Sequence, residues 1–263
     1  ERVYKEHPKD PLSAYALYRV AVNQERFFDF DEAVQSYELF NDKYRNKPQS
    51  DMDAVGLKFD LKEKRGDALR SAAVLRENLQ KYTSAANTYE KYADSYSDND
   101  QAPEASWRAV ITWEKAGNYP KMIKAIQRFN RDHGSSAKYD AKVLQGKMKI
   151  ADYYELQKRD KKSADKQYKQ IISDFQQRGL QAGSPGAFFA AKSQFMLAER
   201  QFTAWDRIKI KGKLKSQKKL LQTKIEGQKA LTVEYEKVWE YRSLEWTMAS
   251  SYRIGSLFQG FAL

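Results

Sequence analysis

The chain has 263 residues, a formal net charge of +12 and a hydrophobic content of 41%. This hydrophobic content, together with only 12 Gly and 6 Pro, predicts ordered helix and argues against disorder. Cysteine is absent, which excludes disulfides, thiol nucleophiles and thiolate metal sites. No apolar run is long enough to predict a membrane span. The positive charge allows nucleic acid, anionic lipid or an acidic protein as a partner, and it suits a solvated lysine-rich surface equally well.

The first two helical hairpins are expected before residue 97. Asp10-Pro11 is typical of a helix start, because Asp caps free backbone N–H groups and Pro lacks an N–H that would need a partner. The helix that begins there is paired with a second helix over 31–45. Residues 51–79 are interpreted as one extended helix, whose partner helix covers 83–96.

The clearest hairpin follows. Pro103 begins its first helix, and Gly117 supplies a turn because glycine tolerates the left-handed conformation that ends a helix. Its second helix is predicted over 120–133. Each of these helices has one apolar face that it cannot bury alone, which predicts neighbouring copies of the same hairpin.

A fourth hairpin combines a long helix from Ala137 to about Gln157 with a helix over 161–175. Residues 178–186, RGLQAGSPG, contain three Gly and one Pro and are a candidate hinge. Beyond it we expect a fifth first helix, a basic segment over 207–224, a long helix and a last helix that lacks its partner.

Four second helices align without gaps: AVQSYELFNDKY from Ala33, AANTYEKYADSY from Ala85, MIKAIQRFNRDH from Met122 and ADKQYKQIISDF from Ala164. A small residue is followed four, seven and eleven positions later by large, mostly aromatic ones, as on a packed helix face. The fifth position of this register is occupied by Tyr37, Tyr89, Ile126 and Tyr168.

This pattern resembles the tetratricopeptide repeat family. The small pair in the middle of the first helix falls on Val20-Ala21, Ala72-Ala73 and Ala109-Val110. The fourth copy departs from the family, with Lys161 at an aromatic position and Asp152 in the small pair. The copies start 52, 37 and 42 residues apart, against a family period of about 34.

The resemblance implies an all-α fold, a right-handed α-solenoid of degenerate tetratricopeptide-like hairpins. Residues 1–177 would form the repeats, 178–186 the hinge, and 187–263 a further helical repeat region. The sequence begins without an initiator Met and ends at Phe261–Leu263 within a helical pattern. We therefore expect it to be a trimmed piece of a chain that continues.

In this family the first helices line a concave groove that binds peptides or partner helices. Carrying the groove positions across predicts a basic and aromatic row beside an acidic row, which would hold a polar peptide. The alternative is that the aromatic residues pack between hairpins and the Glu residues are solvated. The predicted groove residues are Tyr18, Arg70, Trp107, Lys149 and Tyr153, with Glu25, Glu77 and Glu114 in the acidic row.

The basic segment has two interpretations. It is a contact patch for anionic lipid, nucleic acid or an acidic partner, or it is a solvated lysine-rich helix face or connector. It holds no aromatic residue for stacking on bases. The candidate patch consists of Arg207, Lys209, Lys211, Lys213, Lys215, Lys218 and Lys219.

No catalytic, cofactor-binding or metal-binding residues are predicted. The two histidines, His7 and His133, are far apart, and His133 occupies an aromatic position of the repeat. No nucleophile elbow, phosphate loop, HExxH motif or EF-hand loop occurs. We therefore expect a non-enzymatic protein without a cofactor.

The tyrosine- and lysine-rich hairpins resemble tetratricopeptide proteins of the bacterial cell envelope. That resemblance implies a periplasmic or outer-membrane-associated adaptor with a protein or peptide partner, acting in outer-membrane assembly, division or motility. The alternative is a cytosolic helical-repeat protein that uses its basic surface to bind nucleic acid.

Overall fold

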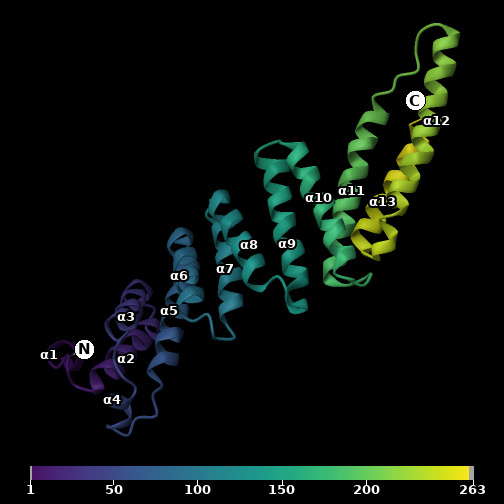
Figure 1. Ribbon diagram of the computed structural model, residues 1–263. Helices are drawn as coiled ribbons and strands as arrows, with labels where there is room; N and C mark the ends of the chain where they lie inside the picture. Colours follow the sequence, from purple (N-terminus) through teal and green to yellow (C-terminus); the bar gives the residue numbers. More distant parts are fainter. Residues whose placement is uncertain (1, 261–263) are drawn as a thin grey trace. The chain divides into compact units, whose positions relative to one another are not determined.

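The computed structural model describes residues 2–260, which form helices joined by short loops and contain no strand (Figure 1). The predicted all-α class is therefore confirmed, as a succession of helical hairpins. The described residues belong to two compact units, Glu1–Arg131 and Asp132–Leu263. The expectations about the two ends of the sequence fall outside the described residues.

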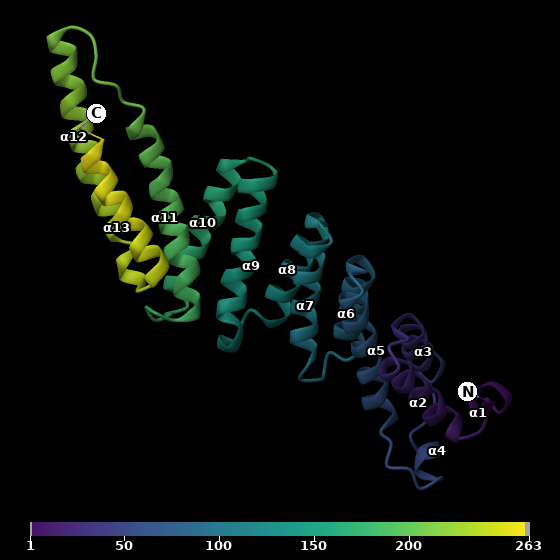
Figure 2. The ribbon, with the colours of Figure 1, turned by 180° about the vertical axis from the view of Figure 1, so that it is seen from behind.

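Unit 1 is a run of paired helices in which α2 packs on α3, α3 on α5, α5 on α6 and α6 on α7 (Figures 1 and 2). In each pair a first helix is followed by a second helix: α2 is paired with α3, α5 with α6, and α7 with α8. The helices are α1 (Arg2–Glu6), α2 (Leu12–Arg26), α3 (Phe30–Lys43), α4 (Ser50–Asp53), α5 (Leu61–Asn78), α6 (Tyr82–Ser95), α7 (Ala102–Lys115) and α8 (Tyr119–His133), the last of which ends two residues past the unit boundary.

The extended helix predicted over 51–79 is wrong. The chain leaves α4, turns at Gly56 with a φ of 70° and starts α5 afresh. The Asp60 side chain caps α5 by accepting a hydrogen bond from the backbone N–H three residues on. Met52 and Phe59, which flank the turn, are buried in the first core. An inserted short helix and loop therefore account for the 52-residue spacing between the first two copies.

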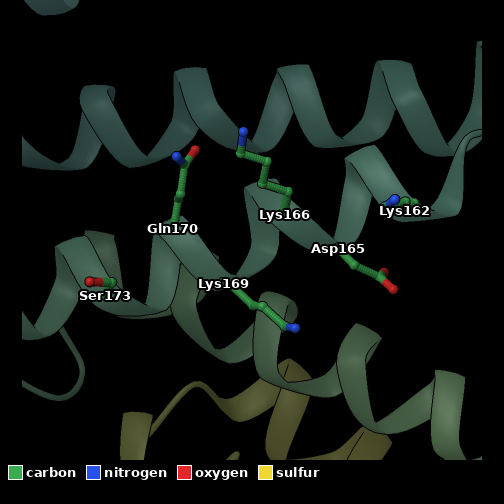
Figure 3. Close-up of a pocket in the computed structure, with 6 residues that line it drawn as sticks. All are labelled: Lys162, Asp165, Lys166, Lys169, Gln170 and Ser173. Atoms are coloured by element: carbon green, nitrogen blue, oxygen red, sulfur yellow. The ribbon is translucent and has the colours of Figure 1, made fainter.

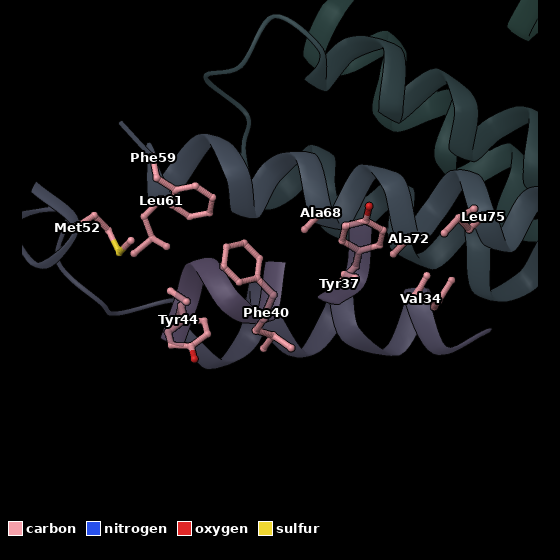
Figure 4. Close-up of a cluster of buried hydrophobic side chains, with 14 residues drawn as sticks. Val34, Tyr37, Phe40, Tyr44, Met52, Phe59, Leu61, Ala68, Ala72 and Leu75 are labelled. Carbon is pink, nitrogen blue, oxygen red and sulfur yellow. The ribbon is translucent and has the colours of Figure 1, made fainter. Parts of the chain in front are cut away.

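The core of the first hairpin shows why the register matters (Figure 4). Tyr37 and Phe40 of α3 lie against α5, where Ala68 and Ala72 are small enough to let the two helices approach closely. Tyr37, Tyr89, Ile126 and Tyr168 are all buried, so the aligned position does the same packing task in each copy.

Unit 2 consists of longer helices. Helix α9 packs on α10 and α11, α10 on α11, α11 on α12, and α12 on α13. The long helix predicted over 137–157 is present as a helical run that begins as a 3₁₀ turn and ends as a π-helical turn. The elements are η1 (Ala137–Tyr139), α9 (Asp140–Asp152), η2 (Tyr153–Gln157), α10 (Lys161–Gln177), α11 (Pro185–Asp206), α12 (Leu214–Glu236), η3 (Trp239–Tyr241) and α13 (Leu244–Gln259).

Segment 178–186 joins α10 to α11 inside unit 2. Gly179 and Gly183 both have positive φ, 62° and 78°, which ends α10 and turns the chain. The Gly183 N–H donates to the Tyr241 carbonyl oxygen at 2.9 Å, so the loop is tied to η3. Its role as a hinge stays a prediction.

Trp205 holds the last three helices together at one point. Its Nε1–H donates to the Lys224 carbonyl oxygen of α12 at 2.8 Å. A Cβ at Gly227 would lie 2.7 Å from its ring, and one at Gly260 would lie 2.6 Å from it. Only glycine therefore fits on either side of this indole.

Candidate partner-binding groove

Two of the three carboxylates in the acidic row of the predicted groove accept hydrogen bonds within their own hairpins. Glu25 accepts a hydrogen bond from the Tyr37 hydroxyl at 2.6 Å, and Glu77 accepts one from the Tyr89 hydroxyl at 2.9 Å. Each pair joins the last turns of a first helix to the middle of its second helix. Glu114, the third member of the row, is half-buried on α7. These Glu–Tyr pairs fix the two helices of a hairpin against each other.

Glu77 is the most enclosed of these carboxylates, with 8% of its surface exposed. Lys115 of α7 donates to it at 2.8 Å, and the Arg108 guanidinium lies 3.2 Å away. Burial alone would raise the pKa of Glu77, but hydrogen bonds from Lys115 and Tyr89 and the charge of Arg108 outweigh burial and lower it. Glu77 therefore ties two consecutive first helices together as an ionised group.

Two aromatic residues of the other row, Trp107 and Tyr18, pack inward. Trp107 is only 3% exposed, and its ring meets that of Phe129 edge-on at 5.1 Å between centroids. Tyr18 is half-buried, with its ring centroid 5.4 Å from that of Phe40 and 5.5 Å from that of Phe59. Trp107 thus contributes mainly to the core of unit 1.

Arg70 is the exposed member of this row. Its guanidinium lies 3.5 Å from the Asp67 carboxylate, one turn away on α5. The other two predicted residues, Lys149 and Tyr153, belong to unit 2 and are half-buried. The Tyr153 ring lies 5.4 Å from the Tyr154 ring within the π-helical turn.

A pocket of about 230 Å³ opens beside Arg70, between α5, α6 and α7. It places Arg70 and Arg108 on the rim together with Glu104, while Val74 and Tyr89 supply apolar surface. We call it the Arg70–Arg108 pocket. Arg108 and Glu104 were not predicted; Arg108 follows Trp107 directly, and the helical period turns it away from the core face on which Trp107 lies. The complete lining is Arg70, Val74, Tyr89, Gln101, Glu104, Ala105 and Arg108.

A larger hollow of about 650 Å³ lies along α10 (Figure 3). All six lining side chains come from this one helix, and three of them are lysines, so it is a cationic surface. Asp165 within it accepts a hydrogen bond from Arg200 at 2.9 Å. The lining residues are Lys162, Asp165, Lys166, Lys169, Gln170 and Ser173.

Residues 2–260 contain no group of three or more His, Asp or Glu side chains placed to hold a metal ion. His133 lies beside Tyr139, with 5.8 Å between ring centroids. No described helix combines the length and the apolar character needed to cross a bilayer.

The tetratricopeptide repeat family model matches residues 15–47, which span most of α2 and α3. The match supports the tetratricopeptide-like character that the sequence pattern predicted for this hairpin. Such repeats generally mediate protein–protein interactions, and proteins that contain them are typically non-catalytic scaffolds. Comparison with curated proteins found no match.

Proposed function

We propose that the chain is a non-catalytic adaptor that binds a protein or peptide through the first-helix face of unit 1, with the Arg70–Arg108 pocket as the anchor point. The observation that carries this proposal is the pairing of two guanidinium groups with apolar surface in one pocket, next to a matched tetratricopeptide repeat. Guanidinium groups bind carboxylates in a fixed fork geometry. The preferred ligand is therefore a peptide segment that presents a carboxylate beside an apolar side chain.

The pocket is preorganised for this task. Arg108 is held by Glu77 at 3.2 Å and lies over the Tyr89 ring at 5.9 Å, so its position is fixed before a ligand arrives. Arg70 is anchored more loosely, at 3.5 Å from Asp67. A ligand carboxylate would therefore contact Arg108, which is already fixed, and Arg70, which can adjust its position. Because Arg108 is ordered before binding, less conformational entropy is lost when the ligand binds.

The test is selection of peptides that bind the purified chain, followed by titration against two variants. Arg70→Glu reverses a charge on the pocket rim, whereas the control Lys124→Glu reverses one on the exposed surface of α8. We expect Arg70→Glu to weaken the selected peptides about 10-fold or more and the control to leave them within about 2-fold. Peptides that bind both variants equally well would contradict the proposed site.

For the cellular setting, we propose a bacterial envelope adaptor located in the periplasm or at the outer membrane, in assembly, division or motility machinery. The support is the likeness of the tyrosine- and lysine-rich hairpins to envelope tetratricopeptide proteins, with the absence of cysteine as a minor addition. Fractionation of cells that express the full-length protein tests this location. Recovery in the cytoplasmic fraction would contradict it.

A further inference from the structure

The end of the α11–α12 hairpin concentrates positive charge. Between Asp206 and Glu226 the sequence contains no carboxylate. The first seven cations of this stretch are all exposed, some in the loop that leaves α11 and the others in the first turns of α12. We call residues 207–221 the basic tip. Its seven cations are Arg207, Lys209, Lys211, Lys213, Lys215, Lys218 and Lys219.

The basic tip follows the end of α11, which is fixed by packing around Trp205. Trp205, two residues before it, lies between Gly227 and Gly260. Ile208 packs against the buried cluster that surrounds this indole. Further out, the Gln217 side chain donates to the Gly212 carbonyl oxygen at 2.9 Å, which closes the loop onto α12. The cations are thus presented together at the end of an anchored hairpin.

Aliphatic side chains stand exposed among these cations. Ile210 is 42% exposed, Leu214 67% and Leu221 41%. Leu214 and Leu221 are seven residues apart on α12, so they share a helix face, with Lys218 between them. A surface that serves only for solvation gains nothing from exposed aliphatic groups. The interface of a lipid bilayer accepts such groups together with surrounding lysines.

We propose that the basic tip docks on the surface of a bilayer that contains anionic phospholipids. Lysines near such a surface each add to the attraction, and the aliphatic residues insert at the level of the headgroups. Six of the seven cations are Lys, which act as point charges on a diffuse negative surface and need no matched acceptor geometry.

Two other kinds of partner fit the basic tip less well. Single-stranded nucleic acid is held by aromatic stacking beside positive charge, and residues 207–221 contain no aromatic residue. Protein interfaces are enriched in aromatic residues and Arg and depleted in Lys, the reverse of the composition found here. The aliphatic and lysine mixture therefore favours lipid.

Vesicle co-sedimentation with the full chain tests the proposal. The probes are vesicles of pure phosphatidylcholine and vesicles that also contain phosphatidylglycerol. We expect binding to the second kind only, with a strong decrease at high salt. The triple variant Lys209→Glu, Lys211→Glu, Lys213→Glu is expected to lose binding at least 10-fold.

The matched control reverses three exposed lysines of α10, Lys162, Lys166 and Lys169, and so changes the net charge by the same amount. It is expected to keep binding within about 3-fold. An equal loss in this control would overturn the proposal, because net charge alone would then explain the attraction.

A second pair of substitutions, Ile210→Ser with Leu214→Ser, keeps every charge. It is expected to weaken binding several-fold while the salt dependence stays. Unchanged binding would contradict insertion of the tip. Melting curves of all variants verify that each chain is folded before its binding is interpreted.

A short single-stranded oligonucleotide, added at the same phosphate concentration as the vesicles, tests whether the basic tip binds nucleic acid instead. If it binds more tightly than the vesicles and the triple lysine variant abolishes that binding, the tip is a nucleic-acid site and the lipid proposal fails. The lipid proposal does not depend on the proposed groove. We therefore expect Arg70→Glu to leave vesicle binding unchanged.

Discussion

Hairpin α5–α6 of unit 1 and hairpin α9–α10 of unit 2 place a tyrosine at the same position of their second helices. Both Tyr89 and Tyr168 are buried. The Tyr89 hydroxyl donates to Glu77, whereas the buried Tyr168 hydroxyl has no hydrogen-bond partner among the described residues. Twelve residues before Tyr168 lies Leu156, which is exposed in the π-helical turn η2. The ring is thus retained where its polar partner is lost, so apolar packing specifies the hairpin and the Glu–Tyr pair reinforces it.

A third version of the pair supports this interpretation. The Tyr235 hydroxyl of α12 donates to Glu199 of α11 at 2.6 Å, across a hairpin with much longer helices. Arg253 of α13 also contacts Glu199, at 2.7 Å. A buried tyrosine bonded to a carboxylate of the preceding helix therefore recurs in both units, at different sequence spacings.

The largest expected effect concerns packing in unit 1. Replacing Trp107 with Ala removes a buried indole from its contact with Phe129. We expect the free energy of unfolding to fall by about 3–5 kcal/mol. Denaturant unfolding measures it, and Arg70→Ala, on the exposed surface, is the control. A loss below about 1 kcal/mol for Trp107→Ala would show that the indole is not part of the core.

The next effect concerns the buried carboxylate. Glu77→Ala leaves Lys115, Arg108 and the Tyr89 hydroxyl without their shared acceptor. Two of these groups reach solvent, so we expect the free energy of unfolding to fall by about 2–3 kcal/mol. This is less than the loss expected when one partner of a fully buried ion pair is removed. Leu156→Ala, at the corresponding place in unit 2, should cost well under 1 kcal/mol because that side chain is exposed.

A pair of tyrosine variants compares hairpins α5–α6 and α9–α10 most directly. Tyr89→Phe removes a hydrogen bond to a charged group and should cost about 1–2 kcal/mol. Tyr168→Phe removes a buried hydroxyl without a partner, so the stability should stay the same or rise by up to about 1 kcal/mol. Equal losses in thermal or denaturant unfolding would show that the two hairpins use their tyrosines alike.

The smallest effect is a pH dependence. Hydrogen bonds from Lys115 and Tyr89 outweigh the burial of Glu77, so its folded-state pKa lies below the value of 4.5 expected when unfolded. The stabilisation is therefore complete above that value and is lost as the pH falls through the folded-state pKa. Unfolding curves measured across this range should show a shallower acid loss for Glu77→Gln than for the native chain. Identical pH profiles would contradict the assignment.

Periodicity predicted the hairpins well because it reports apolar packing. The register that aligned Tyr37, Tyr89, Ile126 and Tyr168 is the one that the structure buries. The turn at Gly117 has a left-handed φ of 67°, a conformation that favours glycine. These features are local, so neighbouring residues in the sequence carry enough information to find them.

Features that depend on caps and on long-range polar contacts were harder to predict. The sequence Asp60-Leu61-Lys62-Glu63 contains a capping signal that would have ended the extended helix interpretation of residues 51–79. The contact of Glu77 with Lys115 joins residues 38 positions apart, and no local pattern reveals it. The same holds for the Arg70–Arg108 pocket, because its rim is formed by two different first helices.

The most direct test of the adaptor proposal is to map where a selected peptide binds, using backbone amide NMR shifts of the native chain. The proposal predicts that the largest shifts cluster on α5 and α7, around Arg70, Glu104 and Arg108. Shifts confined to the second helices α6 and α8, or to unit 2, would contradict it.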